Sequence, residues 1–377
     1  MTCIYIEQGR LHDSGAPRSN MSNYDQFIGT RPVAAQHAFD EASLARYLST
    51  HVEGFSGELK VEQFKGGQSN PTFMLTAGGR RYVMRRKPPG VLLPSAHAVD
   101  REFRVISALA ATDVPVARAY ALCEDSSVIG TMFYVMDCVE GRVIWDPQLP
   151  GLTPAQRSAH YAELGRVIAA LHRVDFNAVG LSDYGKPGNY IERQVARWTK
   201  QYRAAETEKI EAVERLIEWL PARIPPGDET TIVHGDYRFD NVIFHPSEPR
   251  ILAVLDWELS TLGHPLVDFA YHCMTWRMQA AVGSRGLAGL DLRPLGIPSE
   301  TEYRDTYLRA TGRTQPVSEA HWTYYLVFNM FRLVGILQGI MARALQGNAS
   351  NAQALQAGRR ARPLAEQAWA LAQQLPD

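Results

Sequence analysis

The hydrophobic and polar positions divide the chain into two regions of different character. Between residues 60 and 140, short apolar runs alternate with turn residues around a single helical segment. Residues 151–220 and 300–375 instead show the spacing of amphipathic helices. The pattern therefore predicts an α+β protein with a small mixed N-terminal lobe and a larger, mainly helical C-terminal lobe.

One helical segment is unusually apolar. Residues 324–345 are long enough to span a bilayer and carry Gly335 and Gly339 at the spacing of a close helix contact. Asn329 and Arg332 interrupt this segment, and a charged side chain in the middle of a bilayer is costly. We therefore expect a buried helix whose glycines allow close packing.

Composition narrows the class of partner. The 377 residues are 45% hydrophobic and 21% charged with a net charge of −1, so charge gives no reason to expect nucleic acid or a membrane surface. The four cysteines lie far apart, which argues against a disulfide framework or a structural zinc site and suits a reducing cytoplasm. We expect a cytoplasmic protein with a small-molecule partner.

Residues 1–30 are expected to form a flexible leader. Oligomeric state cannot be inferred from the sequence.

The octapeptide "HGDYRFDN" at 234–241 lies between two apolar runs, "TIV" and "VIF". After "VIF" come the turn "HPSEPR" and a further apolar run that ends in "DWE", so the segment predicts a β-hairpin. Pairing that is symmetric about positions 248–249 would place Val242 opposite Leu255 and Asn241 opposite Asp256. An amide oxygen and a carboxylate would then converge at the open end of the hairpin.

These oxygen ligands suit Mg²⁺, which keeps several waters and takes one or two protein ligands beside substrate phosphates. Asn241 and Asp256 are the predicted ligands, and Glu258 follows at a spacing of two and could reach the same side. Asp236, five residues before Asn241, is left free to accept a proton from a hydroxyl group.

The Asp-x4-Asn spacing, with a second Asp after a short hairpin, resembles the working part of protein-kinase-like phosphotransferases. The chain resembles the aminoglycoside phosphotransferase and choline kinase-like family, and most closely the kinase-like domains fused to acyl-CoA dehydrogenases. The segments that carry this resemblance are "FKGGQSNPTF", "YVMRRKPPGVLLPSAHAVDREF", "HGDYRFDN", "VLDWELSTLGHPLVDFAYH" and "FNMFRLVGILQG".

The resemblance implies a two-lobe fold with an antiparallel N-lobe over residues 31–136, a connector at 137–141 and a C-lobe from 142 to 377. It also implies ATP and Mg²⁺ as cofactors and an alcohol as the phosphate acceptor. Asp236 would act on the acceptor hydroxyl. Arg238, inside the same loop, would either neutralise an anionic acceptor or pair with Asp240.

The stretch "KGGQSNPTF" at 65–73 has small residues between two strand-like runs, which would let backbone N–H groups approach phosphate oxygens. It is either a phosphate-binding loop or an ordinary hairpin turn, and its place before the next strand favours the first. The candidate phosphate-binding residues are Gly66, Gly67, Gln68, Ser69 and Asn70.

The strand "RYVMRRK" at 81–87 is where a kinase-like fold places a phosphate-binding lysine. Alternation puts Val83 and Arg85 on one face, so Arg85 takes that position, with Arg86 or Lys87 as the alternatives if the register differs. Arginine is permanently charged and bidentate, so it is not a simple equivalent of lysine.

The helix predicted at 99–111 carries Glu102 on the same face as its apolar residues. A carboxylate that faces a core needs a cationic partner, for which Arg85 is the candidate; otherwise Glu102 lies at the edge of that face in water. In the connector, backbone groups from Asp137 to Val139 would bind adenine. Met136 would be a gatekeeper-like residue or plain core.

Two stretches, 184–203 and 263–278, are the candidates to line the acceptor site. Both are basic and aromatic, which disfavours a polycationic aminoglycoside as the acceptor and suits an anionic or CoA-linked alcohol. The resemblance suggests a hydroxyacyl-CoA or a hydroxy acid. An aminoglycoside or choline-like kinase and a nucleotide-binding pseudokinase, which the missing strand lysine would allow, stay open as alternatives. A flavin-dependent dehydrogenase finds no room in a chain of this length.

A two-metal hydrolase site could be built from the histidines and aspartates of this region, although no H-x-H or H-E-x-x-H spacing supports it. Its members would be His234, Asp236, Asp256, His264 and His272. The kinase-like interpretation gives two of the neighbouring residues simpler roles. His234 would brace the catalytic loop, and Asp268 would anchor the backbone of the large lobe.

Overall fold

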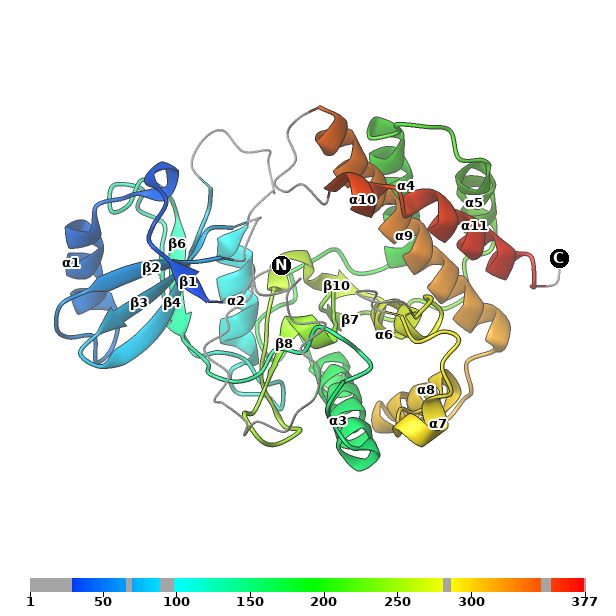
Figure 1. Ribbon diagram of the computed structural model, residues 1–377, viewed down its shortest axis with the longest axis horizontal. Coiled ribbons are helices and arrows are strands. Elements are labelled where there is room, and N and C mark those ends of the chain that lie inside the picture. Colours follow the sequence, from blue (N-terminus) through cyan, green and yellow to red (C-terminus); the bar gives the residue numbers. More distant parts are fainter. Residues whose placement is uncertain (1–28, 66–69, 89–97, 281–285, 347–353, 376–377) are drawn as a thin grey trace.

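A computed structural model describes residues 29–65, 70–88, 98–280, 286–346 and 354–375. Within these ranges the chain forms a small lobe built around one sheet and a larger, mainly helical lobe (Figure 1). The α+β class and the two-lobe arrangement predicted from the sequence are confirmed.

The small lobe is a six-stranded antiparallel sheet in the order β1-β2-β3-β4-β6-β5. Thr30, at the end of the predicted leader, already pairs with Phe64 across β1 and β2. Two helices belong to this lobe, α1 (Glu41–His51) and α2 (Val99–Leu109). The strands are β1 (Thr30–Arg31), β2 (Lys60–Phe64), β3 (Thr72–Ala77), β4 (Arg80–Arg86), β5 (Ala119–Cys123) and β6 (Phe133–Asp137).

The two faces of this sheet belong to different cores because successive side chains of a strand point to opposite sides. Tyr82 and Met84 of β4 pack in one cluster with Leu44 of α1. Val83 packs instead in the cluster that contains Ile106 of α2 and extends into the large lobe. The helix α1 was not predicted from the sequence; Asp40 caps it by accepting the N–H of Ser43 at 2.9 Å.

The large lobe begins with α3 (Pro154–Arg173), whose start is fixed by a capping box in which Thr153 and Gln156 bond each other's backbone. The helical periodicity predicted for 151–220 and 300–375 is confirmed. The other helices of the lobe are α4 (Tyr190–Ala204), α5 (Glu211–Ala222), α6 (Pro265–Cys273), α7 (Leu292–Leu295), α8 (Glu300–Ala310), α9 (Glu319–Leu345), α10 (Ala354–Gly358) and α11 (Ala361–Ala372).

Two short antiparallel sheets hold the central loops of this lobe. One pairs β7 (Thr231–Val233) with β10 (Thr261–Gly263), and the other pairs β8 (Val242–Phe244) with β9 (Ile251–Val254).

The β8–β9 hairpin was predicted, but its register was wrong by one residue. Val242 pairs with Val254 rather than Leu255, and a bulge follows between Ile243 and Phe244. The turn is therefore not symmetric about positions 248–249, and Leu255 donates its N–H to the carbonyl of Asn241 at 2.8 Å. Asn241 and Asp256 are still brought to the same end of the hairpin.

The segment that joins the lobes runs against this hairpin. Arg142 and Phe244 exchange two backbone hydrogen bonds, of 2.7 and 2.8 Å. Gly141 makes this approach possible, because a Cβ atom there would lie 2.2 Å from the carbonyl oxygen of Phe244.

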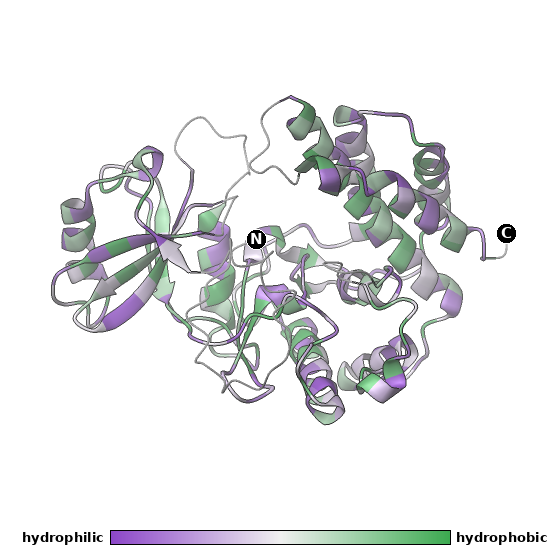
Figure 2. Cartoon of the chain, viewed as in Figure 1, coloured by the Kyte–Doolittle hydropathy of each residue, from purple (hydrophilic) through white to green (hydrophobic). Residues whose placement is uncertain are grey.

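The apolar helix α9 is long and apolar enough to cross a membrane by length and composition, and 67% of its most apolar stretch is buried inside the protein. Figure 2 shows its middle turns coloured as hydrophobic where α4, α6 and α11 pack against it. The prediction of a buried helix is confirmed. The close packing expected from its two glycines is not supported, because a Cβ atom at Gly335 would lie 3.4 Å from the ring of Trp198 on α4 and one at Gly339 would lie 3.7 Å from Nη1 of Arg343, both ordinary contact distances.

Candidate active site

The loop after β7 is held in place by the ring of His234. The Nδ1 atom of His234 accepts the N–H of Asp236 at 3.1 Å, so its Nε2 carries the proton and donates to the carbonyl of Leu255 at 2.8 Å. Gly235 has a φ of +83°, and a Cβ atom there would lie 2.8 Å from the carbonyl oxygen of Leu259. His234 therefore braces the loop, as predicted.

Asp268 of α6 anchors the backbone of the same loop. Its two oxygens accept the backbone N–H groups of His234 and Gly235 at 2.7 and 2.8 Å, and His172 of α3 lies 3.1 Å from Oδ2. Burial alone would raise the pKa of Asp268, but the hydrogen bond from His172 and the backbone donor outweigh it and lower the pKa. The anchoring role predicted for Asp268 is confirmed.

Asp236 is not the free carboxylate that the sequence suggested. Its Oδ1 accepts the phenol O–H of Tyr271 at 2.6 Å, and its Oδ2 accepts N–H groups of Arg238 and Asn241, each at 2.9 Å. The difference arises because the loop folds back so that Arg238 and Asn241 reach Oδ2, while α6 brings in Tyr271 from 35 residues away. A carboxylate has about four lone-pair sites, so one site on Oδ1 remains for a hydroxyl group.

Arg238 divides its charge between two carboxylates. Besides the bond to Asp236, its Nε lies 3.5 Å from Oδ1 of Asp240. Pairing with Asp240, one of the two roles considered for Arg238, is therefore present. Its side chain is 22% exposed.

Asn241 and Asp256 offer a donor set that fits Mg²⁺. Both described hydrogen bonds of the Asn241 side chain use Nδ2, which leaves the amide oxygen to a cation. Asp256 lies beside it, through the Leu255 to Asn241 backbone bond, with a left-handed φ of 65° that Asp tolerates better than most residues. Two hard oxygen donors suit a cation that keeps water and phosphate ligands.

Glu258, the third predicted metal residue, follows in a short 3-10 helix (Trp257–Leu259), where its side chain is exposed. Among the residues that the structure describes, no group of three His, Cys, Asp or Glu side chains is arranged to hold a metal by itself. Both ring nitrogens of His234 are already engaged, and His264 is the N-cap of α6 whereas His272 lies in its last turn. The geometry does not support the two-metal hydrolase site.

A buried ion-pair network joins the lobes behind this site. Nε of Arg85 lies 3.2 Å from Oε2 of Glu102, and its Nη2 lies 3.6 Å from Oδ1 of Asp256. Tyr134 and Asn70 donate to the two oxygens of Glu102, each at 3.0 Å. Burial raises the pKa of Glu102 to about 7, although Arg85 opposes this shift. The predicted pairing of Arg85 with Glu102 is confirmed, and Glu102 does not lie in water.

The two alternatives to Arg85 are used elsewhere. Arg86 lies on the opposite face of the sheet, where it stacks over Phe39 and Phe73 and donates to the carbonyl of His37 at 3.0 Å. Lys87 lies 3.4 Å from Asp100. Arg85 is therefore the cation of this strand that faces the site.

Of the predicted phosphate loop, Gly66, Gly67, Gln68 and Ser69 lie outside the described residues. Asn70 is described and contributes to the site through Glu102. Met136 is buried opposite Val83 on the face that Arg85 shares, and β6 ends at Asp137, whose Oδ1 accepts from Tyr120 at 2.5 Å. Val139 follows as a half-buried residue of the connector.

Sequence reasoning missed Tyr271 and Arg332. Burial raises the pKa of Tyr271, so its phenol stays protonated and donates to Asp236. Arg332 of α9 donates to the carbonyl of Gly235 at 2.6 Å and lies between the rings of Tyr271 and Trp198. Tyr271 follows Asp268 by three residues on one helix face, a spacing that could have identified it. The signal for Arg332 was its position as a charged residue inside an apolar helix, which the sequence analysis used only against a membrane span.

Comparison with known proteins supports this interpretation. Residues 60–322 match the family described as "Phosphotransferase enzyme family". Acyl-CoA dehydrogenase family member 10 of Mus musculus is 47% identical over 342 residues, which cover 90% of this chain and 32% of that protein. Acyl-CoA dehydrogenase family member 11 of Homo sapiens is 43% identical over 341 residues, covering 89% and 43%. The chain thus spans less than half the length of these relatives.

Solved structures agree. A Ralstonia eutropha protein assigned to the aminoglycoside phosphotransferases is 58% identical with a TM-score of 0.83, covering 90% of this chain and all of that one. Aminoglycoside phosphotransferase APH(4)-Ia, in a complex with ADP and hygromycin B, is 15% identical with a TM-score of 0.56, covering 88% and 98%. The similarity to APH(4)-Ia is evidence for a shared fold alone.

Proposed function

Because the chain belongs to the phosphotransferase enzyme family, we propose that it transfers the γ-phosphoryl group of ATP to a hydroxyl group of a small molecule. The observation that supports this most strongly is Asp236. Three donors hold its carboxylate, one lone-pair site remains, and Asn241 contacts it directly. Such a group can orient a hydroxyl and receive its proton.

The roles divide among the residues as follows. Asp236 accepts the proton of the acceptor hydroxyl on Oδ1. Asn241 and Asp256 would hold Mg²⁺, which supplies positive charge against the phosphate oxygens when bound. Arg85 adds a permanent positive charge beside Asp256, with Glu102 fixing its orientation. Glu258 remains a third candidate ligand, exposed at the edge of the site.

The nucleotide contacts are assigned to the face of the small-lobe sheet on which Arg85 lies. Met136 would pack against adenine, and the backbone from Asp137 to Val139 would hydrogen-bond its edge. A solved structure with the same fold contains ADP, which supports the use of a nucleotide by this chain.

For the acceptor we propose a hydroxyacyl-CoA or a free hydroxy acid. Two observations favour it over a polycationic aminoglycoside. Arg197, an exposed residue of α4, lies within the acceptor stretch predicted from the sequence, and Arg332 places a further positive charge beside the catalytic loop. The relatives are also named for acyl-CoA dehydrogenases, enzymes whose substrates are CoA thioesters.

The test is ATP consumption with Mg²⁺ against a panel of hydroxyacyl-CoAs, free hydroxy acids, choline-like alcohols and an aminoglycoside. Turnover on one acceptor class that disappears in Asp236→Asn, with Mg·ATP binding retained, is the expected result. Mg·ATP binding without turnover on any acceptor would favour a nucleotide-binding regulator. Failure to bind Mg·ATP would contradict the assignment of Asn241 and Asp256.

A further inference from the structure

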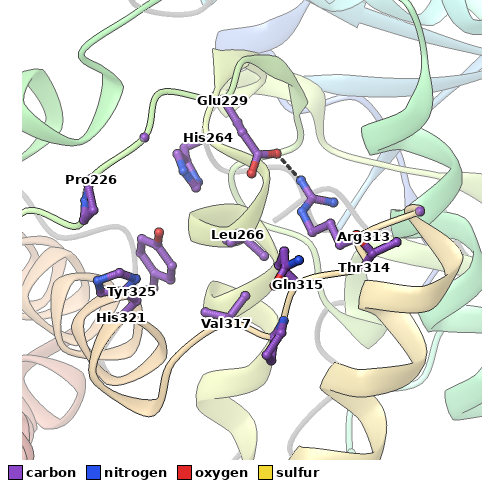
Figure 3. Close-up of a pocket in the computed structure, with 13 residues that line it drawn as sticks. Pro226, Glu229, His264, Leu266, Arg313, Thr314, Gln315, Val317, His321 and Tyr325 are labelled. Carbon is purple, nitrogen blue, oxygen red and sulfur yellow. Dashed lines mark hydrogen bonds and ion pairs between the residues drawn. The ribbon is translucent and has the colours of Figure 1, made fainter.

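A cavity lies at the N-terminal end of α6, at the opposite end of this helix from Tyr271. Its volume is about 470 Å³, within the range of sites for small ligands. Figure 3 shows it between the start of α6, the segment before β7, the loop after α8 and the first turns of α9. Leu266 and Val317 give it an apolar wall.

His264 is the unusual residue of this cavity. Its side chain is 4% exposed, and its Nδ1 is buried with no hydrogen-bond partner among the described residues. The ring lies 5.3 Å from that of Tyr325 across the cavity wall. Burial lowers the pKa of His264 to about 4, so the ring is neutral near pH 7 and presents one donor and one acceptor nitrogen. A buried polar group without a partner is costly unless a ligand supplies one.

The charges around the cavity are of both signs. Arg313 forms an ion pair with Glu229 at its wall (Figure 3), and Nε of Arg313 is buried without a hydrogen-bond partner in the described residues. The N-terminal end of α6 adds positive potential. Arg313 and the helix end favour an anionic group, while Glu229 favours a hydrogen-bond donor.

We propose that this cavity binds a small carboxylate that carries its own hydroxyl or ammonium donor. The carboxylate lies toward Arg313 and the start of α6, the donor toward Glu229, and the carbon chain against Leu266 and Val317. His264 supplies a further hydrogen bond. The site is separate from the phosphotransfer site and does not depend on the function proposed there.

Two routes connect this cavity to the catalytic loop. The carbonyl of His264 accepts the N–H of Asp268 at 3.2 Å within α6. Arg313 lies over the ring of Tyr307 at 5.9 Å, the hydroxyl of Tyr307 contacts Nδ1 of His172 at 2.6 Å, and Nε2 of His172 contacts Asp268. The first route ends at the backbone of Asp268 and the second at its carboxylate, which holds the N–H groups of His234 and Gly235. Ligand binding should therefore slow hydrogen exchange of these two amides.

The experiment is calorimetric titration of the full chain, without nucleotide, with 2-hydroxy and 2-amino carboxylates of increasing chain length. Matched unsubstituted carboxylates and inorganic phosphate separate the contributions of the donor and of simple charge. Arg313→Gln should weaken binding by roughly tenfold or more, since a charged hydrogen bond is lost. Val317→Trp should abolish binding by filling the cavity. Arg309→Gln removes an exposed charge from α8 nearby and should leave binding unchanged.

Three results would overturn the proposal: no binding by any substituted carboxylate, binding that survives Val317→Trp, or phosphate binding as tightly as the substituted acids. Hydrogen exchange measured on the complex then tests whether the cavity is coupled to the catalytic loop. Unchanged protection of His234 and Gly235 in a saturated complex would contradict it. Free hydroxy acids are also the proposed acceptors, so binding that is lost in Val317→Trp but kept in Asp236→Asn assigns it to this cavity, whereas the reverse pattern assigns it to the phosphotransfer site and overturns the proposal.

Discussion

At the scale of single residues, the site depends on carboxylates that are held by several hydrogen bonds, from nearby and from distant parts of the chain. Asp236 receives hydrogen bonds from Tyr271, Arg238 and Asn241, and only the last two are near it in sequence. The carboxylate is therefore oriented before any substrate arrives. Preorganisation of this kind reduces the reorganisation that accompanies a reaction.

Tyr271→Phe tests this orientation. The substitution removes one hydrogen bond to Asp236 and no ring contact, so we expect kcat to fall by roughly tenfold while the KM for ATP stays nearly constant. Tyr237→Phe is the matched control, because this neighbouring tyrosine donates to the carbonyl of Leu164 instead. Equal losses of kcat in both variants would show that Tyr271 acts only through the fold. The measurement is steady-state kinetics on the acceptor class that the substrate panel selects.

Arg85→Met tests the buried network. The change leaves Glu102 and Asp256 buried without their shared cation, so we expect a loss of roughly 3–5 kcal/mol in the free energy of unfolding. Arg81 of the same strand forms an exposed pair with Glu140, and Arg81→Met should cost about 1 kcal/mol or less. Urea unfolding of both variants makes the comparison. Similar losses in the two would mean that Arg85 stabilises the fold no more than a surface pair does.

At the scale of elements, α6 organises the active site. The start of α6 lines the cavity around His264, and Asp268 anchors the catalytic loop. Tyr271 donates a hydrogen bond to Asp236, and His272 is buried in the core of the large lobe. Because these residues lie within nine positions, a movement of this one helix would affect all of them. Of all the elements, α6 is therefore the one whose local stability we expect to change most closely in step with the stability of the active site.

His272→Phe gives a prediction about pH. Burial lowers the pKa of His272 from 6.5 to about 3, so below pH 6.5 the unfolded chain takes up a proton that the folded chain refuses. Its contribution to stability is present above pH 6.5 and is lost as the pH falls toward 3. Each such histidine should add a slope of up to about 1.4 kcal/mol per pH unit in this window.

Removing the titrating group should therefore flatten the decline of unfolding free energy in acid. Urea unfolding at a series of pH values measures this slope. The exposed His51 provides the control, and His51→Phe should leave the slope as in the unchanged chain. A His272→Phe variant with an unaltered slope would refute the buried neutral histidine.

The elements also show how far sequence reasoning extends. Arg85 and Glu102 could be predicted because strand alternation and helical periodicity place each one locally, and a buried carboxylate needs a cation. The hairpin register could not, because the bulge after Ile243 depends on how β8 packs. Tyr271 and Arg332 reach the loop from 35 and 97 residues away, where no periodicity relates them to it.

At the scale of the whole molecule, the two lobes share one core. Val83, Met136 and Ile106 of the small lobe belong to the same buried cluster as the centre of the large lobe. Arg101 of α2 adds two hydrogen bonds across the boundary, to the carbonyls of Tyr184 at 2.7 Å and Ser260 at 3.2 Å. The lobes are thus joined by packing as well as by the connector, and α2 is tied to the large lobe with Glu102 in its paired position.

This arrangement predicts a single cooperative unfolding transition. All seven tryptophans lie at or beyond position 145, so their fluorescence reports the large lobe, whereas Cys123 is buried in the core between α1 and the sheet and reports the small lobe. Urea unfolding followed by tryptophan fluorescence and by the reactivity of the Cys123 thiol should give coincident midpoints.

A variant sharpens the comparison. Arg101→Ala removes both hydrogen bonds across the boundary, so it should lower the midpoint for the small lobe at least as much as that for the large lobe. Small-lobe exposure at lower urea in the unchanged chain would contradict the shared core. In that case Glu102 and Arg85 could separate from Asp256 while the catalytic loop stayed folded, and nucleotide binding would be controlled by lobe opening.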